Sequence, residues 1–196
     1  YLSFTNTDLL QRTNDLVGLK NYFKFYFNPN SIKILSFSII FVFLSTFMQV
    51  SIGFLIALLL NINNKIKNLL RTISLIPWAV PMIVVGYTFS WLLNDQFGLI
   101  NLFNPFWDEK PLIFLSPTAS QITVILVNIW KTMPFVAILL LAGLQGVQSE
   151  LIDASKVDGA NNFQVTKYII IPAILPLAIV ISILLLVSQF GNFDVI

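Results

Sequence analysis

The sequence predicts an all-α integral membrane protein with about four transmembrane spans and a polar helix–turn–helix between the last two. Of its 196 residues, 57% are hydrophobic and only 10% are charged. A soluble domain usually has about 25% charged residues. The apolar residues also gather in long uncharged runs separated by short polar stretches. Because a water-soluble fold of this size cannot bury so much apolar surface, the bilayer is the predicted solvent.

Two domains are expected: an external segment at residues 1–33 and a transmembrane domain at 34–196. An uncharged run longer than about 20 residues crosses a hydrocarbon core of about 30 Å. Prolines inside such runs are tolerated when neighbouring helices satisfy the freed backbone groups. The four predicted spans are 34–60, 72–93 with Pro77 and Pro81, 119–147 with Lys131 and Pro134, and 168–192 with Pro172 and Pro176.

The termini of the sequence suggest that it is a fragment, and the distribution of its basic residues suggests an orientation in the membrane. The chain begins at Tyr1 and stops just after an apolar run, so we expect it to be part of a longer protein. Lys65, Lys67 and Arg71 lie in the short loop 61–71, and this density indicates the cytoplasmic side. Lys and Arg totals are equal on the two sides, so the orientation depends on this loop and on the family resemblance below.

The composition argues against several functional classes. Cysteine and histidine are absent. Disulfides, thiolate metal sites and the commonest general base are therefore excluded. The nine acidic residues are scattered, so we expect no catalytic site and no metal site. The net charge of +2, without a basic tract, argues against nucleic acid as a partner.

The polar segment 148–167 has the local signals of two short helices joined by a turn. Ser149 is a predicted N-cap, and Gly159 suits the left-handed residue that ends a helix. Asn161 or Asn162 is expected to cap a second helix that exposes Phe163 and Val165. Such a feature indicates a partner surface. The alternative is an amphipathic loop that rests on lipid headgroups.

The spacing of this segment resembles the loop by which permease subunits of bacterial ABC importers bind their ATPase. The family pattern is Glu-Ala-Ala, three residues, Gly, nine residues, then Ile-x-Leu-Pro. The spacing matches throughout, although Asp153, Ser155 and Ile171 replace the family's Glu, Ala and Leu. The resemblance assigns ATPase coupling to Glu150, Asp153, Ala154, Ser155, Asp158, Gly159, Ala160, Ile169, Ile171 and Pro172.

Other segments are similar, in the same order, to permeases of the sugar and glycerol-phosphate uptake branch. They are Gly18 to Tyr22, Arg71 to Pro81, Asn128 to Gln145, and Phe193-Asp194. The resemblance implies a family fold of about six spans in a bacterial plasma membrane. It also implies three kinds of partner: two ABC ATPase subunits, a second permease subunit and an extracytoplasmic solute-binding protein. ATP and magnesium would bind the ATPase, since this chain has no Gly-x-x-x-x-Gly-Lys-Ser/Thr segment.

Polar residues inside the spans are the candidates for a solute path. They are Asn128, Lys131, Gln189 and Asn192. A charge inside a span is costly and usually faces a cavity or a partner. For Lys131 the alternative is a structural lysine that snorkels or bonds carbonyls freed at Pro134. For the amides, and for Gln49, the alternative is that they hold helices together.

We therefore expect a non-enzymatic permease subunit for a sugar or related small solute. A permease for another solute class is the first alternative. A channel or membrane scaffold without an ATPase is the second.

Overall fold

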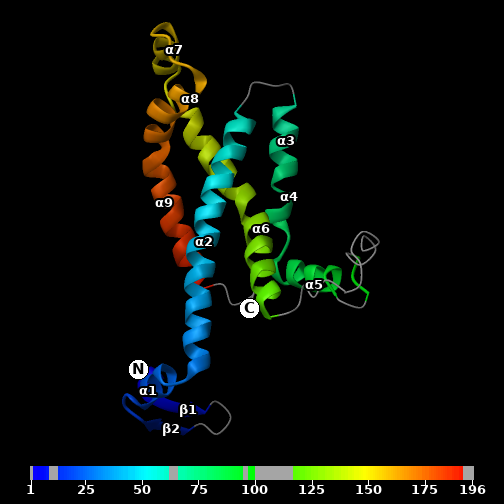
Figure 1. The fold of residues 1–196 in the computed structure, drawn as a ribbon, viewed down its shortest axis with the longest axis vertical. Helices are drawn as coiled ribbons and strands as arrows, with labels where there is room; N and C mark the ends of the chain where they lie inside the picture. The colour runs from blue at the N-terminus through cyan, green and yellow to red at the C-terminus, as the bar shows by residue number, and fades with distance from the viewer. Residues whose placement is uncertain (1, 9–12, 62–65, 95–96, 100–116, 192–196) are drawn as a thin grey trace. The chain divides into compact units, whose positions relative to one another are not determined.

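The computed structural model describes residues 2–8, 13–61, 66–94, 97–99 and 117–191 (Figure 1). Its described residues are mostly helical, which confirms the predicted all-α class. The chain divides into two units, residues 1–40 and 41–196. Each is described by itself.

The first unit contains a small β-hairpin that the sequence did not predict. After a 3-10 turn at Leu2–Phe4, strands β1 (Thr5–Asp8) and β2 (Thr13–Leu16) pair antiparallel. Both strands are short and polar, with no alternating pattern to reveal them. Helix α1 (Lys20–Tyr26) follows, after a turn in which Gly18 has a φ of +57°.

Helix α2 (Pro29–Leu60) begins earlier than the predicted span of 34–60. Proline is favoured in the first turn of a helix, where its missing N–H leaves no bond unmade. Asn28 precedes it, and its side-chain Oδ1 accepts a hydrogen bond from the Asn30 N–H at 3.0 Å. These local signals start the helix before the uncharged run begins.

The second unit is built on α2, α6 (Pro117–Gln145) and α9 (Ile171–Phe190). All three belong to runs that are long and apolar enough to cross a membrane. Their buried side chains form one apolar cluster: Ala57, Leu60, Val136, Leu140, Leu141, Leu144, Ile174, Ile181 and Leu185.

A stripe of small and polar residues lets α2 approach α6 closely. Ser45, Gln49, Gly53 and Ala57 recur every four residues and are all buried. A Cβ at Gly53 would lie 3.0 Å from Val136 Cγ1, so a larger residue would push the helices apart. Small residues at such contacts are typical of helices packed in membranes, where close packing replaces the hydrophobic effect as the driving force.

The second predicted span, 72–93, is not one helix. It is divided among α3 (Lys67–Ser74), α4 (Ile76–Ala79) and α5 (Met82–Leu92). The parts 68–79 and 82–92 meet at 84°, and Figure 1 shows α5 turned away from α3 and α4. Pro81 explains the break, because proline disfavours the helical conformation at the preceding residue. Val80 is extended, with φ −73° and ψ 131°.

The third and fourth spans remain helical through their prolines, with boundaries that differ from 119–147 and 168–192. Helix α6 ends at Gln145 and contains Pro134. The fourth span starts outside the predicted range, because α8 (Asn162–Val165) and a π-helical turn (Thr166–Ile170) run into α9. Pro172 lacks the N–H that would bond the Tyr168 carbonyl, and a π turn is one way to accommodate such a loss.

Candidate functional site

The 149–172 segment forms two short helices joined by a tight turn. Helix α7 (Ser149–Val157) ends where Gly159 takes a φ of +85°, the left-handed conformation that the sequence predicts. The Gly159 N–H donates to the Lys156 carbonyl at 3.1 Å, and the Ala160 N–H donates to the Ser155 carbonyl at 2.9 Å. These bonds close the end of α7, so the turn depends on a residue that tolerates positive φ.

Helix α8 starts with a reciprocal cap, as the sequence predicts for Asn161. The Asn161 side chain accepts from the Gln164 N–H at 2.9 Å, and the Asn161 N–H donates to Gln164 Oε1 at 2.8 Å. This capping box fixes where α8 begins. The N-cap predicted for α7 is wrong by one residue, because Gln148 holds that position and Ser149 is already helical.

Both charged and apolar side chains of this segment face outward. Glu150, Asp153, Ala154 and Asp158 are exposed, as are the apolar Leu151, Val157 and Phe163. Val165 was expected to be exposed but is only 5% exposed, so that expectation is wrong. The remaining assigned residues are half-buried or exposed: Ser155, Ala160 and Ile169 are half-buried, and Gly159, Ile171 and Pro172 are exposed.

The segment lies at the same end of the bundle as the start of α3 (Figure 1). The predicted basic loop 61–71 is shorter than expected, because Lys67 and Arg71 already belong to α3, and Lys65 lies outside the described residues. Two segments that the sequence places on the cytoplasmic side therefore lie at one end of the second unit.

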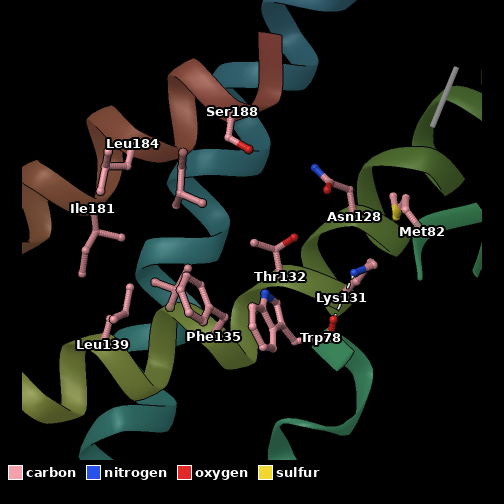
Figure 2. A pocket seen from close by; sticks show the side chains of 12 residues that line it. Trp78, Met82, Asn128, Lys131, Thr132, Phe135, Leu139, Ile181, Leu184 and Ser188 are labelled. Carbon is pink, nitrogen blue, oxygen red and sulfur yellow. Dashed lines mark hydrogen bonds between the residues drawn. The ribbon is translucent and has the colours of Figure 1, made fainter. Parts of the chain in front are cut away.

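A cavity of about 290 Å³ lies among α4, α5, α6 and α9. Trp78 and Phe135 stack on one side of it, with ring centroids 4.8 Å apart and planes at 8°. Figure 2 shows the polar ends of Asn128, Thr132 and Ser188 around the same opening. The other lining residues are Met82, Lys131, Val136, Leu139, Ile181, Leu184 and Leu185.

Lys131 reaches the broken span. Its Nζ donates to the Trp78 backbone carbonyl at 3.2 Å (Figure 2). In an unbroken helix that carbonyl would accept from the N–H of residue 82, but the break at Val80 removes this partner. The sequence suggested carbonyls freed at Pro134, whereas the carbonyl that accepts from Lys131 is at the break beside Pro81.

Three buried amides connect α2, α6 and α9 in a closed cycle, which we call the amide ring. Gln49 Nε2 donates to the backbone carbonyl of Asn128 at 3.2 Å, and Asn128 Nδ2 donates to Gln189 Oε1 at 2.7 Å. Gln189 Nε2 donates back to Gln49 Oε1 at 2.8 Å. Gln49, Asn128 and Gln189 are 0%, 1% and 5% exposed.

The four candidate solute-path residues are thus not equivalent. Lys131 and Asn128 line the cavity, but the Asn128 amide is committed to the ring. Gln189 belongs to the ring and is not among the residues that line the cavity. Asn192 lies outside the described residues. Thr132, Ser188 and the Trp78–Phe135 stack were missed, because single hydroxyls and aromatics in apolar spans carry no distinctive signal.

Comparison with known proteins gives the family. The profile of the binding-protein-dependent transport system inner membrane component matches residues 49–196. The chain belongs to this family.

Relatives of this transport family include sugar permeases. The trehalose/maltose transport system permease protein MalF of Thermococcus litoralis is 35% identical over 185 residues, covering 92% of this chain and 61% of the relative. The maltodextrin transport system permease protein MdxF of Bacillus subtilis is 29% identical over 213 residues, covering 100% of this chain and 49% of the relative. The chain therefore spans half to three-fifths of these relatives.

Solved structures show the same fold. A bacterial alginate ABC transporter in complex with an alginate-bound periplasmic protein matches with a TM-score of 0.77 and 24% identity, over 89% of this chain and 60% of that chain. A second alginate importer structure matches with a TM-score of 0.80 and 22% identity, over 89% and 62%. The family and the fold agree with the resemblance found in the 149–172 segment.

Proposed function

We propose that this chain is part of a permease subunit of a binding-protein-dependent ABC importer. The observation that carries the proposal is the 149–172 segment, in which Gly159 and the Asn161 cap hold two exposed helices at one end of a membrane-spanning bundle. The helix pair α7 and α8 has a defined turn and cap and exposes Leu151, Val157 and Phe163, so it is suited to binding a protein partner. In this proposal the partner is a separate ATPase subunit, which binds ATP and magnesium.

We assign the cavity beside Trp78 to the solute path. The stacked aromatics and the hydroxyls of Thr132 and Ser188 suit a sugar, whose apolar face packs on rings while its hydroxyls form hydrogen bonds. The sugar permeases among the relatives support this solute class. Lys131 contributes by fastening α4 to α6, which fixes Trp78 as one wall of the cavity.

The assembly that follows has the chain in a bacterial plasma membrane with residues 149–172 in the cytoplasm. A second permease subunit would complete the path, and an extracytoplasmic solute-binding protein would deliver the sugar. One solved neighbour is an alginate transporter in complex with a periplasmic protein, which is consistent with a partner of this kind.

The test is to purify the tagged full-length permease from its native host and identify the subunits that copurify. An ATPase and a second permease should copurify with the wild type. Deletion of residues 149–160 should remove the ATPase but leave the protein in the membrane. Recovery of the ATPase with the deletion variant would overturn the coupling role, and solute flux without any ATPase would favour a channel.

Orientation is tested separately, because the chain has no native cysteine. Single cysteines at Asn64 and Asn161 should react with an impermeant maleimide only from the cytoplasmic side, and one at Asn104 only from outside. Labelling of position 161 from outside would overturn the proposed topology.

A further inference from the structure

Helix α1 carries an aromatic cluster that is not buried by the part of its own unit that the structure describes. Phe23, Phe25, Tyr26 and Phe27 are 52–73% exposed, and α1 has no buried residue. Phe23 and Phe27 stack with centroids 6.3 Å apart, and Tyr26 meets Phe27 edge-on at 5.5 Å. Leaving so many large aromatic side chains in water is unfavourable, so this face needs an apolar environment.

The residues at the start of the chain, from Ser3 to Thr5, cover a neighbouring side of α1. Asn21 Nδ2 donates to the Ser3 and Thr5 carbonyls, both at 3.1 Å. The Tyr22 hydroxyl donates to Ser3 Oγ at 2.9 Å, and its ring lies 5.6 Å from that of Phe4. Asn21 and Tyr22 are held against Ser3, Phe4 and Thr5, and Phe23, Tyr26 and Phe27, spaced three and four residues apart, form the open face.

The position of α1 along the chain indicates the depth of this face. Only Phe27 and Asn28 separate α1 from α2, which has the hydropathy of a membrane span. The 32 residues of α2 extend about 48 Å at 1.5 Å per residue, more than the core of about 30 Å. The uncharged part of α2 begins after Lys33, so the first turns of α2 lie near the headgroups, and α1 lies there with them.

The charge near the cluster complements lipid phosphate. Lys20, Lys24 and Lys33 are exposed, and no acidic residue occurs from Leu16 to Leu60. We propose that residues 19–33 form an interfacial anchor, in which the open aromatic face lies at the boundary of acyl chains and headgroups. Lys20 and Lys24 bind the phosphates of anionic phospholipids. Aromatic and basic side chains on one short helix are the usual means of holding a segment at that depth.

The anchor is tested in the full permease complex reconstituted in liposomes of phosphatidylcholine and phosphatidylglycerol. Nitroxide labels on Phe23→Cys and Tyr26→Cys report collisions with oxygen, which concentrates in lipid, and with a nickel chelate, which remains in water. Asn6→Cys on the hairpin is the matched control. Oxygen collisions should exceed nickel collisions at positions 23 and 26, and the reverse should hold at position 6.

Equal or greater nickel collisions at positions 23 and 26 would overturn the proposal in favour of a solvated helix. Low collision rates with both reagents would overturn it in favour of a protein that covers the face, such as a solute-binding protein.

The proposed phosphate binding by Lys20 and Lys24 is tested by replacing both lysines with glutamine or both with arginine. Lys20→Gln with Lys24→Gln should shift the balance at position 26 toward nickel in the anionic liposomes but not in pure phosphatidylcholine. The Arg pair should behave as wild type in both. An equal shift in the two lipids would contradict phosphate binding.

Discussion

The amide ring and the 149–172 segment are both polar regions of an apolar chain, but their surroundings are opposite. Every ring side chain is 5% exposed or less, and each donates to another member of the ring. In the 149–172 segment the polar bonds are local, within α7, the turn and α8, and the apolar Val157 and Phe163 are 88% and 73% exposed.

This difference separates two uses of polarity in a membrane protein. In the ring, the polar atoms form hydrogen bonds with one another. These bonds fix how α2, α6 and α9 are aligned relative to each other. In the segment, polar bonds shape the backbone and leave apolar side chains outside, where only a partner can cover them. Substitutions in the two regions should therefore fail in different assays.

The largest effect is expected at Gly159. In Gly159→Val a β-branched residue must adopt φ +85°, at a cost of about 1–2 kcal/mol, which corresponds to roughly a 5- to 30-fold loss of the docking-competent turn. No atom lies within 4 Å of a Cβ built there, so the effect comes from the backbone and not from a clash. ATPase copurification and solute-stimulated ATP hydrolysis measure it.

Two controls isolate that effect. Gly159→Asn should retain most ATPase recovery, because asparagine tolerates the left-handed region. Gly18→Val introduces the same strain at φ +57° in the first unit and should leave ATPase recovery unchanged. Normal recovery and stimulation in Gly159→Val would remove the main support for an importer.

The second-largest effect is expected from substitutions in the amide ring, and it should be a loss of thermodynamic stability. Gln189→Leu leaves Asn128 Nδ2 and Gln49 Oε1 without a partner and should lower the free energy of unfolding by about 1–2 kcal/mol. Thermal unfolding of the purified permease measures this loss. Ser182→Ala is the control on α9, since among the described residues its hydroxyl bonds only the Ala178 carbonyl of its own helix.

A double-mutant cycle sharpens this test. If the ring acts as a unit, Gln49→Leu with Gln189→Leu should cost less than the sum of the single variants. Additive losses would mean that the three amides stabilise the bundle independently.

Lys131 is neither fully buried like the amide ring nor exposed like much of the 149–172 segment. We expect its substitution to have a smaller effect than the changes at Gly159 and in the ring. Lys131→Met removes the bond to the Trp78 carbonyl and should reduce uptake by roughly 2- to 10-fold without loss of insertion. Lys131→Arg keeps a donor and should retain more activity. Fluorescence of a variant with Trp78 as its only tryptophan should shift in Lys131→Met alone. Uptake kinetics equal to wild type would make Lys131 a snorkelling lysine without a role in the path.

The smallest effect is expected at Asp153. Among the described residues, no hydrogen bond or ion pair holds this exposed carboxylate in place. Asp153→Ala should change ATPase recovery by about twofold or less, because an exposed polar contact is usually worth under about 1 kcal/mol. A loss as large as that of Gly159→Val would show that the carboxylate, and not the turn, dominates docking.

Local signals were readable from the sequence, and long-range partners were not. Gly159 and Asn161 were predicted because a left-handed turn and a helix cap depend on residues a few positions away. The ring joins residues 79, 61 and 140 positions apart, so no pattern within one span could pair them. Burial of Val165 and acceptance by the Trp78 carbonyl also depend on packing between helices.

The prolines also show that effects which depend on packing between helices could not be predicted from the sequence. Pro134 lies inside a continuous α6, whereas Pro81 stands at an 84° bend. Both occur in predicted apolar spans, and both were expected to be tolerated because neighbouring helices satisfy the freed backbone groups. The difference lies in how the backbone before Pro81 finds another donor, and that donor, Lys131, is on a different helix.

The helical run from Asn162 to Phe190 has a mechanical consequence. It is a continuous helical run of 29 residues, about 44 Å long at 1.5 Å per residue, whose first residues form the second half of the 149–172 segment. Gln189, near its far end, is held by Gln49 and Asn128. A movement at the α8 end of this helical run is therefore expected to act on the end that Gln189 holds. A displacement of α8 would thus be passed along α9 toward the contact among α2, α6 and α9 next to the cavity, and the π-helical turn at Thr166–Ile170 and the two prolines that follow it are where the run can bend.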